Sequence, residues 1–429
     1  MKTGPLLSLL APEQLRCVQA LLAQAGQLLN ITPRFKYFTL HGTTHLNNML
    51  DIAGEFVDSG MRLTQEEAFL LACSIAIHDL GMVIPLKEFE SVDIFGGIPQ
   101  PTEPTSIENR IRDLHHELLD QYLSKHTDFL AGIGLTLPEM SIIREISRGH
   151  RKIDLNAQPG HCRSIGALIR VIDELDLHAN RAPQIIVREH YEEFDATSCW
   201  HWFKHNIVAA WSEGHTVKTT HNTGKTFTLA VHPSQEQAIP YWLNQVRRPI
   251  HKALYDENCA RIINEVWRYD ITVVPSQDLS SAGPLDIIWK NIENKAMSAG
   301  RKVIMVADDE VRKMEDLFIP LMDKYHIIFA PNAKDALDKL AASKIDLAII
   351  DLQMGSGHMW NAIDTGDFKR TGWILCKTIK EKYPETRIGI LSGSRHAIED
   401  QAARVETSFN LKKPVDPEEF ERAVRHVLE

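Results

Sequence analysis

Four polar residues on otherwise apolar segments stand where they could bind a metal. His78 and Asp79 are adjacent at the end of an apolar run, AFLLACSIAIHDLGM, and a buried histidine and aspartate cost free energy unless something binds them. His45 lies on the apolar stripe of the predicted helix 44–57, and Asp173 lies in a second apolar segment, ALIRVIDELDLHANR. Two imidazoles and two carboxylates suit a borderline transition metal, namely Mn²⁺, Fe²⁺, Zn²⁺, Co²⁺ or Ni²⁺. Such a metal would activate water and polarise a phosphoryl oxygen.

The order of these residues resembles the HD phosphohydrolase superfamily, whose signature is H…HD…D. The resemblance covers roughly residues 38–181, and its phrases HGTTH, IHDLGM, RDLHHE and IRVIDELD look most like HD domains found beside Hsp90-like ATPases. By position, the resemblance implies that His45, His78, Asp79 and Asp173 are metal ligands. It also implies that Asp79 is a catalytic residue and a candidate proton acceptor.

Dinuclear HD enzymes, such as HD-GYP phosphodiesterases and HD nucleases, carry additional histidines between the HD pair and the last aspartate. In this chain His115, His116 and His150 lie in that interval. The resemblance implies that one of the two adjacent histidines, together with His150, binds a second metal or contacts substrate phosphate. We take His116 and His150 as catalytic candidates, although the sequence leaves open which adjacent histidine points inward. The GYP motif is absent, which disfavours a cyclic di-GMP phosphodiesterase of that type.

A second set of polar residues follows the strands predicted near the C-terminus. From Arg301 onward, the apolar runs KVIMVA, HIIFA, DLAIID, RIGILS and SFNL alternate with helical segments. This pattern predicts a doubly wound parallel sheet, in which ligands bind at the carboxyl ends of the strands. The polar residues at those ends are Asp308, Asp309, Asp351, Ser392 and Lys413. Three carboxylates there can hold one hard divalent cation, and the lysine and hydroxyl can bind a phosphoryl group.

This arrangement resembles the receiver domain of response regulators over residues 301–429. The resemblance implies that Asp351 accepts a phosphoryl group from a histidine kinase or a phosphotransfer protein. It further implies that Asp308, Asp309 and Asp351 bind Mg²⁺, that Ser392 is the switch hydroxyl and that Lys413 contacts the phosphate. The loop after Asp351 departs from the receiver pattern in two ways. Met354 is followed by Gly355 rather than proline, and residues 355–370 form an insertion.

The chain is predicted to be a multidomain protein. An all-α HD domain (1–183) is followed by a mixed α/β extension (184–274), a linker with a connecting helix (275–300) and a flavodoxin-like receiver domain (301–429). In the extension, residues 216–233 alternate like a β-hairpin with its turn at 222–225, and residues 241–267 are predicted to be helical. The linker is PSQDLSSAGP, and the connecting helix covers 285–297.

Composition narrows the classes of partner. The net charge of −10 and the pI of about 6.1 disfavour a protein that coats nucleic acid or an anionic membrane. The N-terminus carries no recognisable signal peptide, and the longest apolar stretch is interrupted by His78 and Asp79, so we expect no membrane segment. The six cysteines are scattered without a CxxC motif, which is typical of reduced core cysteines in a cytoplasmic protein.

Two weaker signals are interpreted as structural. His201 and His205 are four residues apart beside Trp200 and Trp202, and without a third ligand nearby we predict an aromatic packing segment. Residues 224–226, Gly-Lys-Thr, match the end of a phosphate-binding loop, but they lie in the predicted hairpin and the first glycine of that motif is missing.

The sequence therefore predicts a two-component signalling protein. Its HD domain would hydrolyse a phosphate ester or anhydride in a nucleotide-like substrate, and phosphorylation of Asp351 would regulate it through the connecting helix. Alternatives are a catalytically silent HD scaffold or sensor that relays the receiver state to a protein partner, or an HD nuclease on single-stranded nucleic acid. The negative net charge of the chain makes the nuclease the weaker of these hypotheses. Receivers and HD proteins often dimerise, so a homodimer is compatible with both resemblances.

Overall fold

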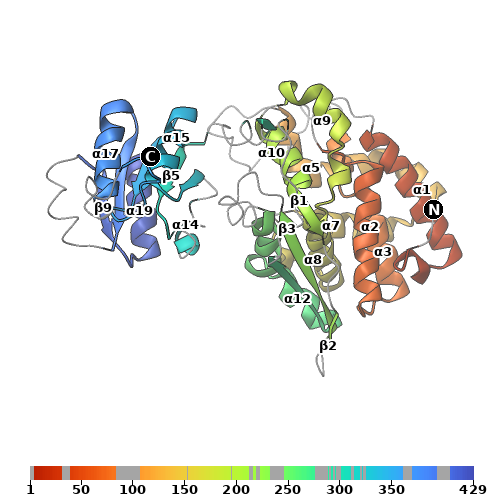
Figure 1. Cartoon of the computed structure of the whole chain (residues 1–429). Helices are drawn as coiled ribbons and strands as arrows, with labels where there is room; N and C mark the ends of the chain where they lie inside the picture. The colour runs from red at the N-terminus through yellow and green to blue at the C-terminus, as the bar shows by residue number, and fades with distance from the viewer. Residues whose placement is uncertain are drawn as a thin grey trace. The chain divides into compact units, whose positions relative to one another are not determined.

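The computed structural model describes residues 4–30, 39–83, 107–151, 153–194, 196–211, 216–218, 223–231, 246–275, 288, 291–292, 295, 301–310, 314–318, 321, 325–360, 370–393 and 406–429. These residues fall into two compact units, one within Met1–His232 and Val246–Gly283 and the other within Pro284–Glu429. Figure 1 shows the helical first unit in red to green and the second unit in cyan to blue. Among the described helices, none has both the length and the apolar character needed to cross a membrane.

The predicted linker and connecting helix are mostly outside the described residues. Only Pro275 of the linker is described, at the end of a strand. Within the connecting helix, residues 288, 291, 292 and 295 are described, and all four are helical.

Helices build most of the first unit. They are α1 (Pro12–Asn30), α2 (Thr43–Asp58), α3 (Gln65–Ile77), α5 (Ile107–Lys125), α6 (Thr127–Gly132), α7 (Leu137–Arg148), α8 (Gly160–Leu175), α9 (Gln184–His190) and α10 (Ala196–Ile207), with short 3-10 turns η3 (Leu80–Val83), η4 (Leu155–Ala157) and η5 (Ala179–Arg181). Capping boxes start α3 at Thr64 and α7 at Thr136, where each threonine and a glutamate three residues later satisfy free backbone donors.

Helix α3 lies at the centre of this bundle. Every residue from Ala68 to Ile77 is buried, because a helix that is apolar on all sides must be enclosed by others. Helices α1, α2, α7 and α8 all pack against it. The end of α3, where His78 and Asp79 follow, is therefore inside the protein.

A small sheet completes the first unit. Its strands are β1 (Val208–Trp211), β2 (Thr216–Lys218), β3 (Thr223–Val231) and β4 (Tyr269–Pro275). Strand β3 is antiparallel to β1 and β2 and parallel to β4. The antiparallel pairing of β2 with β3 agrees with the predicted hairpin. The predicted turn at 222–225 is wrong in its described part, because residues 223–225 lie in β3 and pair with residues 216–218. Residues 219–222 lie outside the described part. Phe56 of α2 packs edge-on against Phe227 and Tyr269, with ring centroids 5.6 and 5.8 Å away, so sheet and bundle share one core.

The single helix predicted at 241–267 is wrong in its described part. Residues 246–251 are helical, Lys252–Asp256 form a π-helix, and α12 starts anew at Cys259–Trp267. Asn258 separates them with a left-handed backbone, φ 60°, a conformation that asparagine tolerates better than most residues. Helical periodicity in the sequence does not reveal such an interruption.

The second unit confirms the doubly wound sheet. Its strands are β5 (Val303–Ala307), β6 (His326–Ala330), β7 (Leu347–Ile350), β8 (Arg387–Ser392) and β9 (Phe409–Lys412), and its helices are α14 (Glu315–Phe318), α15 (Ala333–Ala342), α17 (Thr371–Lys382) and α19 (Pro417–Leu428). The strand order is β6-β5-β7-β8-β9, with every pair parallel. This is the flavodoxin-like order, which places the first and third strands side by side at the sheet centre.

Candidate functional site

Residues from several helices converge at the end of α3. His45 lies on α2, His78 and Asp79 directly follow α3, His115 lies on α5, His150 follows α7, and Asp173 lies in the last turn of α8. Their ligand atoms form the groups His45–His78–Asp173 and Asp79–His115–His150, and within each group all atoms lie within 4.8 Å of one another. A third such group, His41–His45–Asp79, overlaps both.

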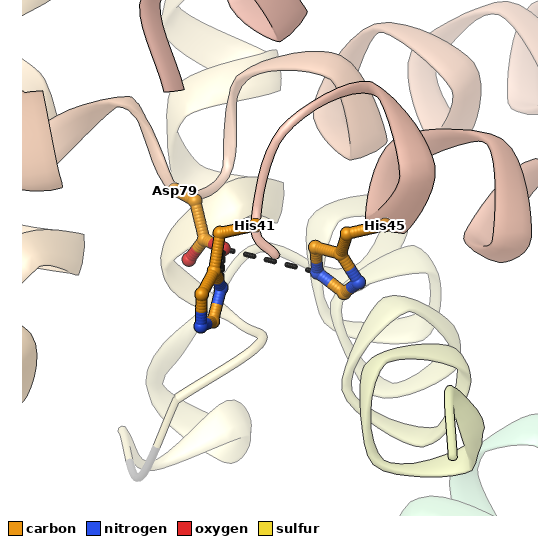
Figure 2. A group of neighbouring side chains, drawn as sticks. All are labelled: His41, His45 and Asp79. Carbon is orange, nitrogen blue, oxygen red and sulfur yellow. Dashed lines mark hydrogen bonds and ion pairs between the residues drawn. The ribbon is translucent and has the colours of Figure 1, made fainter. Parts of the chain in front are cut away.

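The Asp79 carboxylate lies between the two sets of imidazoles. Its Oδ2 is 3.3 Å from His78 Nε2 and 3.8 Å from His45 Nε2. Its Oδ1 is 3.1 Å from His115 Nε2 and 3.9 Å from His150 Nε2. Figure 2 shows the Asp79 carboxylate contacting both His41 and His45. A carboxylate in this position can bridge two cations, because each oxygen faces a different pair of nitrogen ligands.

The histidine tautomers favour metal binding. The Nδ1 of His78 lies 2.9 Å from the Ile75 carbonyl oxygen, and that of His115 lies 2.5 Å from the Arg112 carbonyl oxygen. The Nδ1 of His150 likewise meets the Ser147 carbonyl. Because a carbonyl oxygen only accepts, each Nδ1 must carry the proton and donate, which leaves the Nε2 lone pair for a metal.

His45 also donates from Nδ1, but its acceptor is a carboxylate rather than a backbone carbonyl. Its Nδ1 donates to Asp176 Oδ2 at 2.6 Å, and Asn48 Nδ2 donates to the other Asp176 oxygen at 2.8 Å. The Nε2 atoms of His45 and His78 then face each other at 3.2 Å, as those of His115 and His150 do at 2.8 Å. Each pair brings two Nε2 atoms within hydrogen-bond distance, so the two nitrogens can share one proton or, once that proton is lost, can bind one cation.

The centre is enclosed on most sides. His45, His78, His115 and His150 are at most 4% exposed, whereas the side chains of His41 and Asp173 are 26% and 24% exposed. Burial would raise the pKa of the Asp79 carboxyl, but His78, His115 and His41 hold it well below its usual range. Burial would lower the pKa of His78, but Asp79 and Asp173 raise it to about 9. The Asp79 carboxylate therefore stays ionised, and a metal cation would take the place of the proton that His78 holds.

Two glycines allow the close approach of the elements that carry the ligands. A Cβ on Gly81 would lie 1.8 Å from the His115 carbonyl oxygen, so only glycine lets η3 pack against α5 and bring His115 beside Asp79. A Cβ on Gly149 would lie 2.7 Å from Gly166 Cα. That contact holds the end of α7, and therefore His150, against α8.

The structure distinguishes His115 from His116. His115 contacts Asp79, whereas His116 Nε2 lies 3.5 Å from Glu117 Oε1 and its Nδ1 has no hydrogen-bond partner among the described residues. Consecutive helical residues point about 100° apart, so both cannot face one centre. The catalytic role expected for His116 therefore does not agree with its position, while His150 does lie in the cluster.

The sequence did not identify His41, Arg181 or Asp176 as residues of this site. His41 Nδ1 lies 2.9 Å from Asp79 Oδ2, and Arg181 Nη2 lies 3.3 Å from His41 Nδ1. Burial and then Arg181 hold the pKa of His41 at about 4. Asp176, which orients His45, also lies 3.4 Å from Arg181 Nη1. The HGTTH phrase contained the signal for His41, because His41 and His45 are four residues apart.

The second unit brings the expected receiver residues together. Lys413 Nζ donates to Asp308 Oδ2 and to Asp351 Oδ2, both at 2.6 Å, and Ser392 Oγ donates to Asp351 Oδ1 at 2.8 Å. Ligand atoms of Asp308, Asp309 and Asp351 lie within 4.8 Å of one another. Burial raises the pKa of the Asp308 carboxyl, which Lys413 opposes. Asp309 is exposed, so this carboxylate edge is open to a cation from solvent.

The loop after Asp351 is described in part. Met354 is buried, and the Gly355 carbonyl accepts a hydrogen bond from Ala333 N at 3.1 Å, which ties the loop to the start of α15. Gly357 has a left-handed φ of 66°. Of the predicted insertion, residues 361–369 lie outside the described part.

The predicted packing role of the segment around His201 and His205 holds for its aromatic residues. Trp202 and Phe203 are fully buried, and the Trp202 ring lies 5.0 Å from that of Phe194. His201 has an additional polar contact, since Arg112 Nη1 donates to its Nε2 at 2.8 Å.

Comparisons with known proteins found similar solved structures and one matching family model. The receiver domain of an HD domain-containing protein from Pseudomonas fluorescens Pf-5 is 27% identical, covers 30% of this chain and 94% of its own, and has a TM-score of 0.25. The response regulator TrrA from Thermotoga maritima, solved with Mg(2+)-BeF, is 24% identical. The match spans 29% of this chain and 98% of the TrrA chain, with a TM-score of 0.24. No curated protein matched. Residues 35–252, more than half of the chain, match the HD-CE family. The chain belongs to the HD-CE family.

Proposed function

We propose that the first unit is a metal-dependent phosphohydrolase that acts on a phosphate ester or anhydride in a nucleotide-like substrate. The observation that carries this proposal is the common orientation of His45, His78, His115 and His150. Each uses Nδ1 as a donor to a fixed acceptor and directs Nε2 toward the carboxylates. A purely structural core would not need four imidazoles whose Nε2 atoms converge in facing pairs beside two carboxylates.

The donor set fits two cations. His45, His78 and Asp173 would hold one, His115 and His150 would hold the other, and Asp79 would bridge them. Imidazole and carboxylate together suit Mn²⁺, Fe²⁺, Zn²⁺, Co²⁺ or Ni²⁺. When bound, such ions lower the pKa of water toward neutrality and polarise a phosphoryl oxygen.

The chain's own residues supply orientation, enclosure and a proton path. The enclosed side formed by His78, His115 and His150 excludes bulk water, and the partly exposed side formed by His41 and Asp173 admits the substrate. His41 Nδ1 donates to Asp79 Oδ2 and so orients the carboxylate that would accept a proton from the attacking water. Asp176 holds the proton on His45 Nδ1 and keeps that imidazole in its ligating tautomer.

The test is a metal and activity analysis of the full-length protein. The metal-loaded protein is screened against nucleotides, cyclic dinucleotides and guanosine polyphosphates, beside Asp79→Ala and the matched control Asp51→Ala, an exposed carboxylate on α2. We expect the wild type and the control to bind metal and hydrolyse phosphate, and Asp79→Ala to lose both. Metal binding without hydrolysis of any compound would favour the scaffold, and unchanged metal binding by Asp79→Ala would refute the assigned site.

We further propose that the second unit is a phosphorylated receiver. A carboxylate oxygen of Asp351 would attack the phosphorus of a phosphohistidine on a histidine kinase or phosphotransfer protein, and the imidazole would leave. Lys413 and Ser392, which contact Asp351, would then hold the new phosphoryl oxygens, and Asp308 and Asp309 would hold Mg²⁺. This proposal is supported by the position of these residues, which lie together at one edge of the sheet.

Regulation of the hydrolase by the receiver completes the proposal. Receiver phosphorylation biases a two-state element, and the two units belong to one chain. Beryllofluoride with Mg²⁺ mimics the phosphoryl group, and we expect it to change the hydrolase rate or the oligomeric state of the wild type but not of Asp351→Asn. No change in either property would refute the coupling.

A further inference from the structure

The loop that follows α7 carries His150 across the surface of α8. His150 lies two residues beyond the end of α7, and its Nε2 is 2.8 Å from His115 Nε2 and 3.9 Å from Asp79 Oδ1. A Cβ on Gly149 would lie 2.7 Å from Gly166 Cα, so the loop touches the backbone of α8. His150 therefore keeps its position only while this loop stays against α8.

Arg170 of α8 fixes the loop on both sides of His150. It is 4% exposed and lies one turn along α8 from the glycine that the loop touches, on the same face of the helix. Its Nε donates to the Gly149 carbonyl at 2.7 Å, and its Nη2 donates to the Ile153 carbonyl at 3.0 Å and to the Arg151 carbonyl. Such carbonyls just beyond a helix end have no helical donor of their own. The guanidinium thus binds the residues directly before and after His150.

Glu257 of the α/β extension in turn holds Arg170. Arg170 Nη1 donates to Glu257 Oε2 at 2.9 Å, so every nitrogen of the guanidinium has an acceptor. Glu257 lies where the helix predicted at 241–267 is interrupted, between the π-helix and α12, and both of these elements pack against α8. A buried guanidinium that lost this carboxylate would keep an uncompensated charge. The ion pair therefore connects the extension to the loop that carries His150.

A second ion pair joins the same two helices and provides a comparison. Arg163 of α8 lies about two turns before Arg170, and its Nη2 is 3.0 Å from Glu265 Oε2 on α12. These two side chains are 28% and 48% exposed, whereas those of Arg170 and Glu257 are 4% and 20% exposed. Because solvent screens an exposed pair, only the buried pair is expected to affect the metal cluster.

We propose that Arg170 and Glu257 are positioning residues that make the extension part of the cation site at His115 and His150. This inference rests on the proposed two-cation centre and deepens it, because it places one of the two cations under the control of the extension. Without the ion pair the loop would move, and His150 Nε2 would no longer face His115 Nε2. The ligands of the other cation come from α2, the end of α3 and α8, and not from this loop, so that cation should stay bound.

Cobalt titration of the metal-free, full-length protein tests the inference without any turnover. Visible absorption and equilibrium dialysis follow the binding of the two Co²⁺ ions, and the reference variant His150→Ala identifies the step that belongs to its site. Glu257→Ala should weaken that step by about tenfold or more, the usual effect of removing a group that orients a ligand, and leave the other step unchanged. The matched control Glu265→Ala, which removes the exposed ion pair, should change neither step.

Two further measurements separate positioning from a general loss of stability. If Glu257 acts through His150, a protein that carries both Glu257→Ala and His150→Ala should bind cobalt as His150→Ala alone does. Hydrogen exchange of the metal-free protein should become faster at the amides of residues 149–151 in Glu257→Ala, because the loop opens more often. Glu257→Gln keeps an acceptor for Arg170 and should recover part of the cobalt affinity. It also replaces Glu257→Ala in each measurement if that variant does not fold.

The inference is overturned if the folded variants bind both Co²⁺ ions as tightly as wild type does, if they lose both equally, or if exchange at residues 149–151 does not change. A wild type that binds a single Co²⁺ would overturn it as well, but not the proposed hydrolysis, which one metal can support. Failure of the proposed function is distinguishable from these outcomes. It appears as two bound metals without turnover of any phosphate compound, which leaves the role of Arg170 and Glu257 intact.

Discussion

Asp176→Asn tests whether the orientation of His45 determines metal affinity. Asp176 is 1% exposed, and its two oxygens accept from His45 Nδ1 at 2.6 Å and from Asn48 Nδ2 at 2.8 Å. The substitution keeps the shape but replaces one oxygen by an amide that donates. If Asn48 keeps its acceptor, the new amide faces His45 Nδ1. His45 must then carry its proton on Nε2, directed at His78 and Asp173, where it blocks a metal.

The expected loss follows from the contacts that change. Removal of a carboxylate that orients a ligating histidine typically costs 10- to 100-fold in metal affinity, which corresponds to about 1.4–2.8 kcal/mol. Arg181 keeps its hydrogen bond to the Leu40 carbonyl but loses the carboxylate 3.4 Å away. We therefore expect a stability loss of about 1–3 kcal/mol in the metal-free protein, which leaves it folded.

Competition with a chelator measures metal affinity, and urea denaturation measures stability. The matched control is Asp154→Asn, an exposed carboxylate that caps the turn η4, where asparagine caps equally well. The control should keep both properties. If folded Asp176→Asn retained wild-type metal affinity, the argument that the tautomer of His45 determines metal binding would be refuted.

Three further outcomes are expected. Mass spectrometry should show that wild-type protein gains a phosphoryl group from a small phosphoryl donor and that Asp351→Asn does not. The control Asp338→Asn, at an exposed carboxylate, should still gain it. A phosphorylated Asp351→Asn would contradict the acceptor assignment. Burial and then Arg301 hold the pKa of His326 at about 4. Because this histidine binds a proton more tightly in the unfolded state, the stability of the second unit should fall by up to about 3 kcal/mol as pH drops from 6.5 to 4. His326→Asn should flatten that pH dependence in urea titrations, and an unchanged slope would disprove the cause. Phe56→Ala should cost about 3–5 kcal/mol of unfolding free energy, against about 0.5 or less for the exposed Phe129→Ala; equal losses would show that α2 and the sheet do not share a core.

The receiver residues were the easiest to predict from sequence. Asp308, Asp351 and Ser392 each follow or end an apolar strand, and parallel strands end at the same edge, so strand order alone brings them together. The contact of Lys413 with Asp308 and Asp351 agrees with that expectation. In this unit the alternation of apolar strands and helices along the sequence is enough to predict which residues meet at the sheet edge.

The choice between His115 and His116 illustrates what sequence could not supply. The rotation of α5 about its axis decides which histidine faces Asp79, and a contact with η3 determines that rotation. Gly81 packs against the His115 carbonyl, and these two residues are far apart in the chain. A single sequence shows the glycine but not the surface that it meets.

The same limit explains why Asp173 was named as a ligand and Asp176 was not. Both lie at the end of α8, three residues apart, and either could have faced His45. In the structure, Asp173 Oδ1 is 3.4 Å from His45 Nε2, whereas Asp176 Oδ2 is 2.6 Å from His45 Nδ1. The two carboxylates therefore bracket one imidazole, and only the position of α2 relative to α8 assigns their separate roles.

The adjacency of His78 and Asp79 has a geometric reason. Two consecutive residues at a helix end point about 100° apart, so His78 meets His45 while Asp79 reaches His115 as well. The enclosed ligands leave only the side of His41 and Asp173 partly exposed. Arg181 contacts His41 on that same side. A substrate of the proposed hydrolase would therefore reach the cluster at His41 and Asp173, the two members of the cluster that are partly exposed to solvent.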